Sequence, residues 1–152
     1  MEVEQYLAEL GITLPNVSKP VASYVPAVCG GKLLFVSGQL CTVSGELKYK
    51  GKVGRNVSLE DAYEAAKAST INSLAVIKKV LGSLDRVKRI VKVVGFVNSD
   101  PNFTEQHKVI NGASDLLVKI FGDKGHHARS AVGVTALPFD ASVEVELVVE
   151  IE

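Results

Sequence analysis

Arg129 and Glu144, near the end of the chain, carry the side chains needed to bind a carboxylate and to handle a water molecule. The planar guanidinium of an arginine offers a carboxylate two parallel, charge-assisted hydrogen bonds, which a lysine cannot arrange. A second carboxylate nearby can orient a water or pass a proton. On spacing alone, a cross-strand ion pair on a solvated sheet is the simpler interpretation, so the pattern locates these residues without deciding what they do.

Both residues stand in segments where apolar and polar residues alternate, as expected of strands with one buried face. In the last segment the apolar set, which should face the helices, is Val143, Val145, Leu147, Val149 and Ile151. Glu144 then points to the other face of the sheet. In the preceding segment the set assigned to the helix side is Ala128, Ser130, Val132 and Val134. Arg129, Ala131 and Gly133 would therefore share the helix-free face with Glu144, and the small residues would leave space for a ligand.

The elements of the first part of the chain follow from periodicity and turn residues. Residues 3–10 have apolar residues at helical spacing and are followed by Gly11, which predicts a short helix. Residues 23–28 and 32–37 flank a glycine turn and predict a β-hairpin, in which Pro26 favours an edge position. Residues 42–56 are polar and rich in glycine, and are interpreted as a surface loop that could include a short strand.

Two longer helices are expected in the middle of the chain. Ser58 is followed three residues later by an acid, which predicts the start of a helix that runs to Gly82. The valine-rich residues 87–97 read as a buried strand. Asp100-Pro101 offers a cap and a first-turn proline for a second helix that ends near Gly122. Residues 128–135 and 142–151 are expected to form an antiparallel hairpin across a proline-containing turn.

This order of elements predicts an α+β fold in one domain, a mixed sheet with two helices on one face. A length of 152 residues and a hydrophobic content of 47% are enough to build one core. We expect residues 1–19 to be an N-terminal extension with a short helix, and residues 20–152 to form the domain. Because the helices cover one face only, the other face should meet solvent or another subunit, which favours a homo-oligomer with sites near its interfaces.

Charge and hydropathy argue against several classes of protein. Basic and acidic residues balance at 17 each, so no overall field attracts nucleic acid or an anionic membrane. No apolar run approaches the roughly 20 residues of a membrane span, and the acidic start is unlike a secretory signal. We therefore expect a soluble cytoplasmic protein in which Cys29 and Cys41 are free thiols.

Several short motifs, in order along the chain, carry a resemblance to a known family. They are Tyr24-Val25, Phe35-Val36-Ser37-Gly38-Gln39, Gly95-Phe96-Val97, Ala128-Arg129-Ser130-Ala131-Val132, Leu137-Pro138 and Val143-Glu144-Val145-Glu146. On these motifs the chain is identified as a member of the reactive intermediate deaminase family, also called Rid or YjgF. The resemblance implies a chorismate-mutase-like fold and a homotrimer whose sheets form a central barrel, with three clefts between subunits.

The resemblance also implies an activity. Family members with the arginine hydrolyse 2-imino acids, the tautomers of released enamines, to 2-oxo acids and ammonia without a cofactor. Carried over to this sequence, Arg129 would bind the substrate carboxylate and Glu144 would position the attacking water. Tyr24 would line the cleft from a neighbouring subunit, and Gly38 and Ser130 would contribute further contacts to the substrate.

Two residues depart from the common pattern of this family. Ala131 stands where many deaminases have a cysteine, and Gly133 stands where a charged or polar residue is common. Both could enlarge the pocket and change which substrate side chain fits. The Gly125-His126-His127 motif and the N-terminal extension resemble a divergent branch of the family.

Other sites and functions have weaker support in the sequence. His126 and His127 are adjacent and would face opposite sides of a strand, so no metal site is expected, even with His107. The label of L-PSP endoribonuclease that the family sometimes carries makes activity on RNA one alternative, against which the balanced charge argues. The second alternative is a non-enzymatic protein that binds a small carboxylate in the same clefts.

Overall fold

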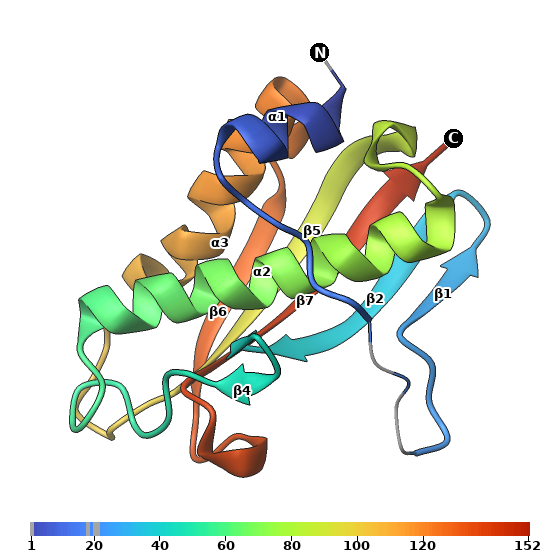
Figure 1. The fold of residues 1–152 in the computed structure, drawn as a ribbon. Helices are drawn as coiled ribbons and strands as arrows, with labels where there is room; N and C mark the ends of the chain where they lie inside the picture. Colours follow the sequence, from blue (N-terminus) through green and yellow to red (C-terminus); the bar gives the residue numbers. More distant parts are fainter. Residues whose placement is uncertain (1, 18, 20–21) are drawn as a thin grey trace.

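A five-stranded mixed sheet, covered on one face by helices, forms the core of the fold (Figure 1). The computed structural model describes residues 2–17, 19 and 22–152. The strands lie in the order β1-β2-β7-β5-β6. Their bounds are Ala27–Gly30 for β1, Leu33–Leu40 for β2, Val87–Asn98 for β5, Ala128–Val134 for β6 and Val143–Ile151 for β7. The predicted α+β class is confirmed.

Three α-helices, a small second sheet and three 3₁₀ turns complete the described residues. The helices are α1 (Val3–Glu9), α2 (Leu59–Leu81) and α3 (Gln106–Phe121), and the turns are η1 (Leu84–Arg86), η2 (Gly122–Gly125) and η3 (Pro138–Asp140). The small sheet pairs β3 (Thr42–Val43) with β4 (Glu46–Leu47), inside the segment predicted as a loop with a short strand. Figure 1 shows α2 and α3 side by side on one face of the sheet, as predicted. None of the described helices is long and apolar enough to cross a membrane.

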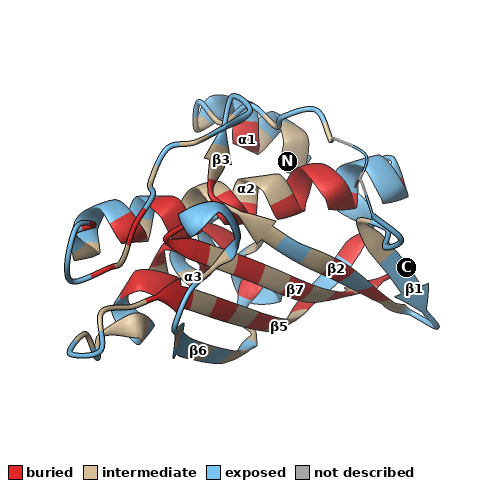
Figure 2. Ribbon diagram, turned by 90° about the horizontal axis from the view of Figure 1, so that it is seen from below, coloured by how far each residue is buried: buried red, intermediate tan, exposed pale blue. Residues whose placement is uncertain are grey.

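Strand β7 lies at the centre of the sheet because its alternating valines fill the core. It pairs antiparallel with β2 on one side and with β5 on the other. Every second residue from Val143 to Ile151 is buried, and the residues between them are half-buried. Figure 2 shows buried residues on β5 and β7, whereas the edge strands β1 and β6 are exposed or half-buried. The prediction that the apolar set of β7 faces the helices is confirmed.

Helix α2 begins and ends where its capping residues predict. The amide of Asp61 donates to the Ser58 hydroxyl at 3.1 Å, and Gly82 ends the helix with a positive φ of 84°. Small side chains such as Ala62 and Ala66 are fully buried, and Ala66 lies against Gly112 of α3, so the two helices pack closely. Val80, near the end of the helix, is 46% exposed.

Helix α3 starts later than predicted. Asp100 does not cap it: its carboxylate accepts the amide of Asn102 at 3.0 Å and the guanidinium of Arg55 at 2.9 Å. These bonds close a tight turn and hold the pKa of Asp100 below its usual value. The helix begins only at Gln106. The Asp-Pro pair therefore marks a turn after β5, a role that these residue types also favour.

The predicted hairpin between the last two strands is wrong. Strand β6 pairs with β5 in parallel, and β7 inserts between β2 and β5. A parallel pair needs a crossover connection, and α3 supplies it on the helix-covered face. The alternation within each strand predicted the strands themselves but not their order in the sheet, in which β7 is central.

The N-terminal segment packs on the rest of the chain through a few definite contacts. Leu7 of α1 is buried, the amide of Val3 donates to Asp85, and Glu4 accepts the amide of Leu84. From α1 the chain runs across α2 toward β1 (Figure 1). The expected boundary between residues 19 and 20 adjoins Pro20, which lies outside the described residues, so it stays a prediction. Pro26 directly precedes the edge strand β1, as predicted.

Candidate functional site

Arg129 lies on the helix-covered face of the sheet, not on the helix-free face predicted for it. In the parallel ladder it is level with Val93, whose other neighbour is Leu147, and both of these are buried under the helices. Its Nη1 atom donates to Asn111 Oδ1 at 2.8 Å and to Ser114 Oγ at 3.2 Å, and both acceptors belong to α3. The face assignment made from alternation in β6 is therefore reversed.

The small residues of β6 explain the reversal. A Cβ atom on Gly133 would lie 2.8 Å from the side-chain nitrogen of Gln106 in α3, and Ala131 packs against the core. Only small side chains fit where the helix approaches this edge strand. Val132 consequently points the other way and is 43% exposed on the helix-free face. Ala131 and Gly133 do not open a pocket on that face, as the sequence had suggested they could.

Glu144 lies on the helix-free face, as predicted, and packs over Gly38. The carboxylate is so close that a Cβ atom on Gly38 would lie 2.9 Å from Glu144 Cδ. Its neighbours in the ladder are Phe96 of β5 and Leu40 of β2. Burial raises the pKa of Glu144, and the charge of Glu146 raises it further. A half-buried carboxylate with a raised pKa is a group suited to holding water or exchanging a proton.

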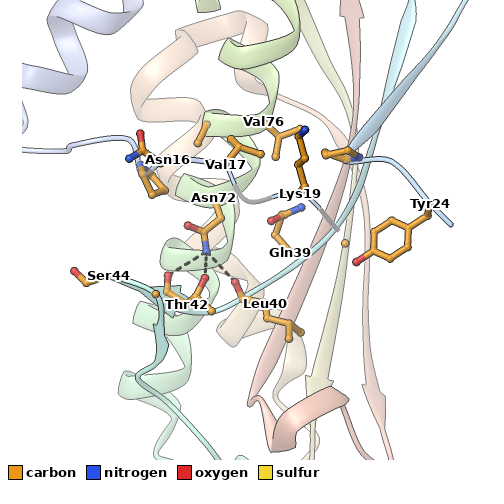
Figure 3. A pocket seen from close by; sticks show the side chains of 15 residues that line it. Asn16, Val17, Lys19, Tyr24, Gln39, Leu40, Thr42, Ser44, Asn72 and Val76 are labelled. Atoms are coloured by element: carbon orange, nitrogen blue, oxygen red, sulfur yellow. Dashed lines mark hydrogen bonds between the residues drawn. The ribbon is translucent and has the colours of Figure 1, made fainter. Parts of the chain in front are cut away.

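Tyr24 and Gly38 line a cavity of about 380 Å³ beside the end of β2 (Figure 3). Asn72 of α2 forms part of its wall and donates to the carbonyls of Leu40 and Thr42 and to the Thr42 hydroxyl. Tyr24 is 61% exposed. Neither Arg129 nor Glu144 lines this cavity, although Glu144 contacts Gly38 at its edge.

Within one chain, Arg129 and Glu144 are not brought together. Glu144 is level with Phe96 and Val132, so Arg129 stands two strands across the sheet and three residues along it. Ordinary sheet spacings make that about 10 Å in each direction, with the side chains on opposite faces. A substrate of a few carbon atoms cannot contact both. Ser130, the other candidate in β6, is exposed on the face opposite the Arg129 side chain.

The candidates thus fall into two groups, which we call half-sites. The glutamate half-site contains Tyr24, Gly38 and Glu144. The arginine half-site contains Arg129 with three residues around it, Asn111, Ser114 and His127. Sequence reasoning did not find Asn111 and Ser114, although their spacing on α3 puts them on one side of the helix. His127 stands two residues before Arg129, a spacing that places both side chains on one face of an extended segment.

His127 joins the arginine half-site through both ring nitrogens. Nδ1 lies 2.6 Å from the carbonyl of Gly125, and Nε2 lies 2.9 Å from Ser114 Oγ. Burial lowers the pKa of His127. His126 is exposed, and in the described residues no group of three or more His, Cys, Asp or Glu side chains is arranged to hold a metal. Both cysteines are free, Cys29 exposed and Cys41 buried.

The family model described as "YjgF/chorismate_mutase-like, putative endoribonuclease" matches residues 4–151. The chain belongs to the YjgF family. Two relatives and one solved structure are also similar to this chain over nearly its whole length. Protein TCP17 of Trypanosoma cruzi is 47% identical over 146 residues, which cover 95% of this chain and 91% of the relative.

A second relative bears the name of a reaction. The 2-iminobutanoate/2-iminopropanoate deaminase of Dermatophagoides farinae is 30% identical over 147 residues, covering 93% of this chain and 95% of the relative. A crystal structure of an Agrobacterium tumefaciens protein of unknown function superposes with a TM-score of 0.93. That protein is 48% identical, and the match covers 99% of this chain and 92% of that one. The family model confirms the family that the sequence motifs indicated, and its description agrees with the chorismate-mutase-like fold that the resemblance implied.

Proposed function

We propose that this protein hydrolyses 2-imino acids to 2-oxo acids and ammonia, at sites completed between the chains of a cytoplasmic homotrimer. The observation that carries the proposal is the Glu144 carboxylate, half-buried against Gly38 of the Ser37-Gly38-Gln39 motif. A family relative named for this reaction supports the choice of substrate class.

Arg129 supplies the carboxylate-binding group in this proposal. The Nη1 hydrogens are directed at α3, which leaves the Nε and Nη2 hydrogens for a ligand. The Nε hydrogen and one of the two Nη2 hydrogens point in nearly the same direction, and a carboxylate accepts both at once. Binding through the carboxylate holds the imine carbon at a fixed distance from the guanidinium.

Glu144 supplies the water-handling group. Its carboxylate takes a proton from a water molecule, whose oxygen adds to the electrophilic carbon of the protonated imine. Glu144 then passes this proton to the nitrogen of the resulting carbinolamine. The C–N bond breaks, the hydroxyl gives up its proton to form the carbonyl of the 2-oxo acid, and the nitrogen leaves as ammonia or, with that proton, as ammonium. A protonated imine is already reactive, so orientation, one water and a proton path are sufficient and no cofactor is needed.

The distance between the two half-sites requires that they come from different chains. Arg129 lies on the edge strand β6, and Tyr24 and Gly38 lie toward the opposite edge of the sheet. A head-to-tail contact between these edges, repeated three times, closes a ring and forms three equal sites. Tyr24 and the main chain of Gly38 would then face the substrate bound by Arg129 of the neighbouring chain, with Ser130 near the same contact.

The test is ammonia release from 2-iminopropanoate and 2-iminobutanoate generated in the assay, corrected for spontaneous hydrolysis. We expect acceleration by the wild type, loss in Arg129→Ala and in Glu144→Gln, and retention in Glu150→Gln, which changes a glutamate on the same strand and face. Loss of hydrolysis in Glu144→Gln with 2-oxobutanoate binding retained supports the assigned roles. A folded wild type that binds 2-oxobutanoate but accelerates neither reaction would instead be a carboxylate-binding protein.

A further inference from the structure

The guanidinium of Arg129 is anchored on one side by helix α3, which packs against β5 and β6. Its Nη1 atom has two hydrogens and two acceptors, Asn111 Oδ1 and Ser114 Oγ. Asn111 and Ser114 are three residues apart on α3 and therefore lie one above the other on its surface. In the described residues, Arg129 Nε and Nη2 have no hydrogen-bond partner. One edge of the guanidinium is thus held and the other is free.

The direction of the Ser114 hydroxyl follows from the contacts of His127. A carbonyl oxygen only accepts, so the 2.6 Å contact with Gly125 places a proton on His127 Nδ1. In the neutral ring Nε2 is then an acceptor, and the Ser114 hydroxyl donates to it at 2.9 Å. Burial, together with the charge of Arg129, lowers the pKa of His127, which favours the neutral ring. The lone pairs of Ser114 Oγ are left to accept from Arg129.

We infer that Asn111, Ser114 and His127 are positioning residues that orient the Arg129 guanidinium so that its Nε–Nη2 edge receives the carboxylate of the ligand. Asn111 and Ser114 contact the arginine directly, and His127 acts through Ser114. This inference rests on the proposed function only for the identity of the anion. It also gives a role to the Gly125-His126-His127 motif, which the reaction itself does not use.

A held guanidinium binds a planar anion more tightly because less side-chain freedom is lost when the complex forms. The geometry further selects for a carboxylate in the plane of the free edge, so a lysine at this position cannot substitute. Ser114 is half-buried, and in the described residues its hydroxyl has hydrogen-bond contacts with Arg129 and His127 alone. Removing the hydroxyl should therefore leave the fold intact. These features make Ser114 the residue through which the inference is best tested.

The first experiment measures the Kd of 2-oxobutanoate, the stable product, by calorimetric titration of the full-length protein. Ser114→Ala should weaken binding about tenfold, in line with loss of a hydrogen bond to a charged group. Ser114→Thr, which keeps the hydroxyl, should restore most of the affinity. Thr104→Ala removes an exposed hydroxyl just before α3 and should leave the Kd unchanged. In an Arg129→Lys background, Ser114→Ala should have no further effect, because the planar edge is already lost.

The second experiment needs no ligand. Nitrogen NMR of protein labelled with ¹⁵N-histidine should show His127 as the Nδ1–H tautomer, and Ser114→Ala should shift the Nε2 resonance of His127 and leave those of His107 unchanged. An Nε2–H tautomer for His127 overturns the inference, since Ser114 would then be oriented differently. A purely structural role for Ser114 would not predict the rescue by threonine or the dependence on Arg129.

The outcomes separate this inference from the proposed function. If the wild type binds 2-oxobutanoate and Ser114→Ala changes the Kd by less than about twofold, positioning is overturned and the proposed reaction stands. If the wild type hydrolyses no imine but binds 2-oxobutanoate with an affinity that depends on Ser114, the reaction fails and the inference stands. A folded wild type that does not bind 2-oxobutanoate at all overturns the inference, and ammonia release from the imines then decides the proposed reaction separately.

Discussion

Arg129 and Glu144 lie on opposite faces of one sheet, two strands apart. Arg129 faces α3, where Asn111 and Ser114 accept its hydrogens, and Glu144 faces away from the helices, over Gly38. If the two residues serve one small substrate, as the family resemblance implies, they must come from different chains. Because of this separation within the chain, catalysis by both residues would depend on assembly of the chains.

Mixing two inactive variants should therefore restore activity. Arg129→Ala removes one half-site and Glu144→Gln removes the other, so a site between chains is intact when each neighbour supplies its unaltered residue. In randomly mixed trimers roughly a quarter of the sites should be intact, because each of two positions has an even chance of the required chain. Imine hydrolysis by the mixed oligomers, after unfolding and refolding the variants together, measures the recovery.

The matched control mixes Arg129→Ala with a chain that carries both substitutions. That mixture contains no Arg129 at all and should stay inactive. Native mass spectrometry verifies that chains have exchanged in both mixtures. Verified exchange without any recovery would place both residues in a site built by one chain and contradict the arrangement proposed here.

Helix ends and strand faces are often predictable from local sequence patterns, because the interactions that determine them lie within a few residues of the chain. Ser58 and Gly82 bound α2 as expected, since a hydroxyl cap and a left-handed glycine satisfy the ends of a helix within the chain itself. The alternation of β7 correctly gave the face of Glu144. The resemblance in short motifs indicated the family, which the comparison over residues 4–151 confirms.

The start of α3 was a local error, and the errors that affect the site concern relations between distant segments. Alternation shows that β6 has two faces but not which one meets α3. Val132 seemed the better core residue, yet Ala131 and Gly133 face the helix because it approaches too closely for larger side chains. The order of the strands could not be predicted from the sequence either, since β6 and β7 could be joined as a hairpin or lie apart in the sheet. The arginine half-site depended on both of these relations and could not be assembled from sequence.

The half-buried carboxylate of Glu144 should make the protein less stable as pH rises. Its pKa is raised by burial, so the folded state favours the protonated acid. Below the ordinary glutamate pKa of about 4.3 both folded and unfolded states are protonated and the residue has no effect. As the pH rises from the unfolded-state pKa through the folded-state pKa of Glu144, the protein loses stability, and this loss is complete above the folded-state pKa. Glu144→Gln should therefore raise the Tm at pH 7.5 but not at pH values below about 4.

Thermal unfolding of the wild type, Glu144→Gln and Glu150→Gln at both pH values checks this. Glu150 lies on the same strand and face but pairs with Lys88, so its substitution should not raise the Tm at pH 7.5. Imine hydrolysis by the wild type should also fall as the pH decreases. The midpoint of this fall should lie at a higher pH than the pKa of an ordinary glutamate. A Tm for Glu144→Gln below that of the wild type at pH 7.5 would argue that the carboxylate is stabilised by its surroundings.

The exposed apolar residues of the helix-free face should be buried between chains. Val132 is 43% exposed and Phe35 is 48% exposed, on a face that the helices do not cover. A charge there has no partner and would be desolvated on assembly, so Val132→Glu should convert the proposed trimer into smaller species. Val80→Glu is the control, because Val80 is exposed to a similar degree, 46%, but lies on α2. Light scattering after gel filtration distinguishes the two, and equal masses for wild type and Val132→Glu would exclude this face as the interface.

Asn98, at the end of β5, should contribute more to stability than any exposed asparagine. It is fully buried, and its side-chain nitrogen donates to the carbonyls of Gly51 and Ala141 and to Asp140. Lys52 Nζ donates to its oxygen at 3.0 Å. Asn98→Ala would remove a hydrogen-bond donor from the buried carbonyls of Gly51 and Ala141 and should reduce the free energy of unfolding by about 2–4 kcal/mol. Asn102→Ala, an exposed control in the next turn, should cost less than about 0.5 kcal/mol. Urea unfolding at one protein concentration measures both, and equal losses would mean that water replaces the Asn98 amide in the cavity that it leaves.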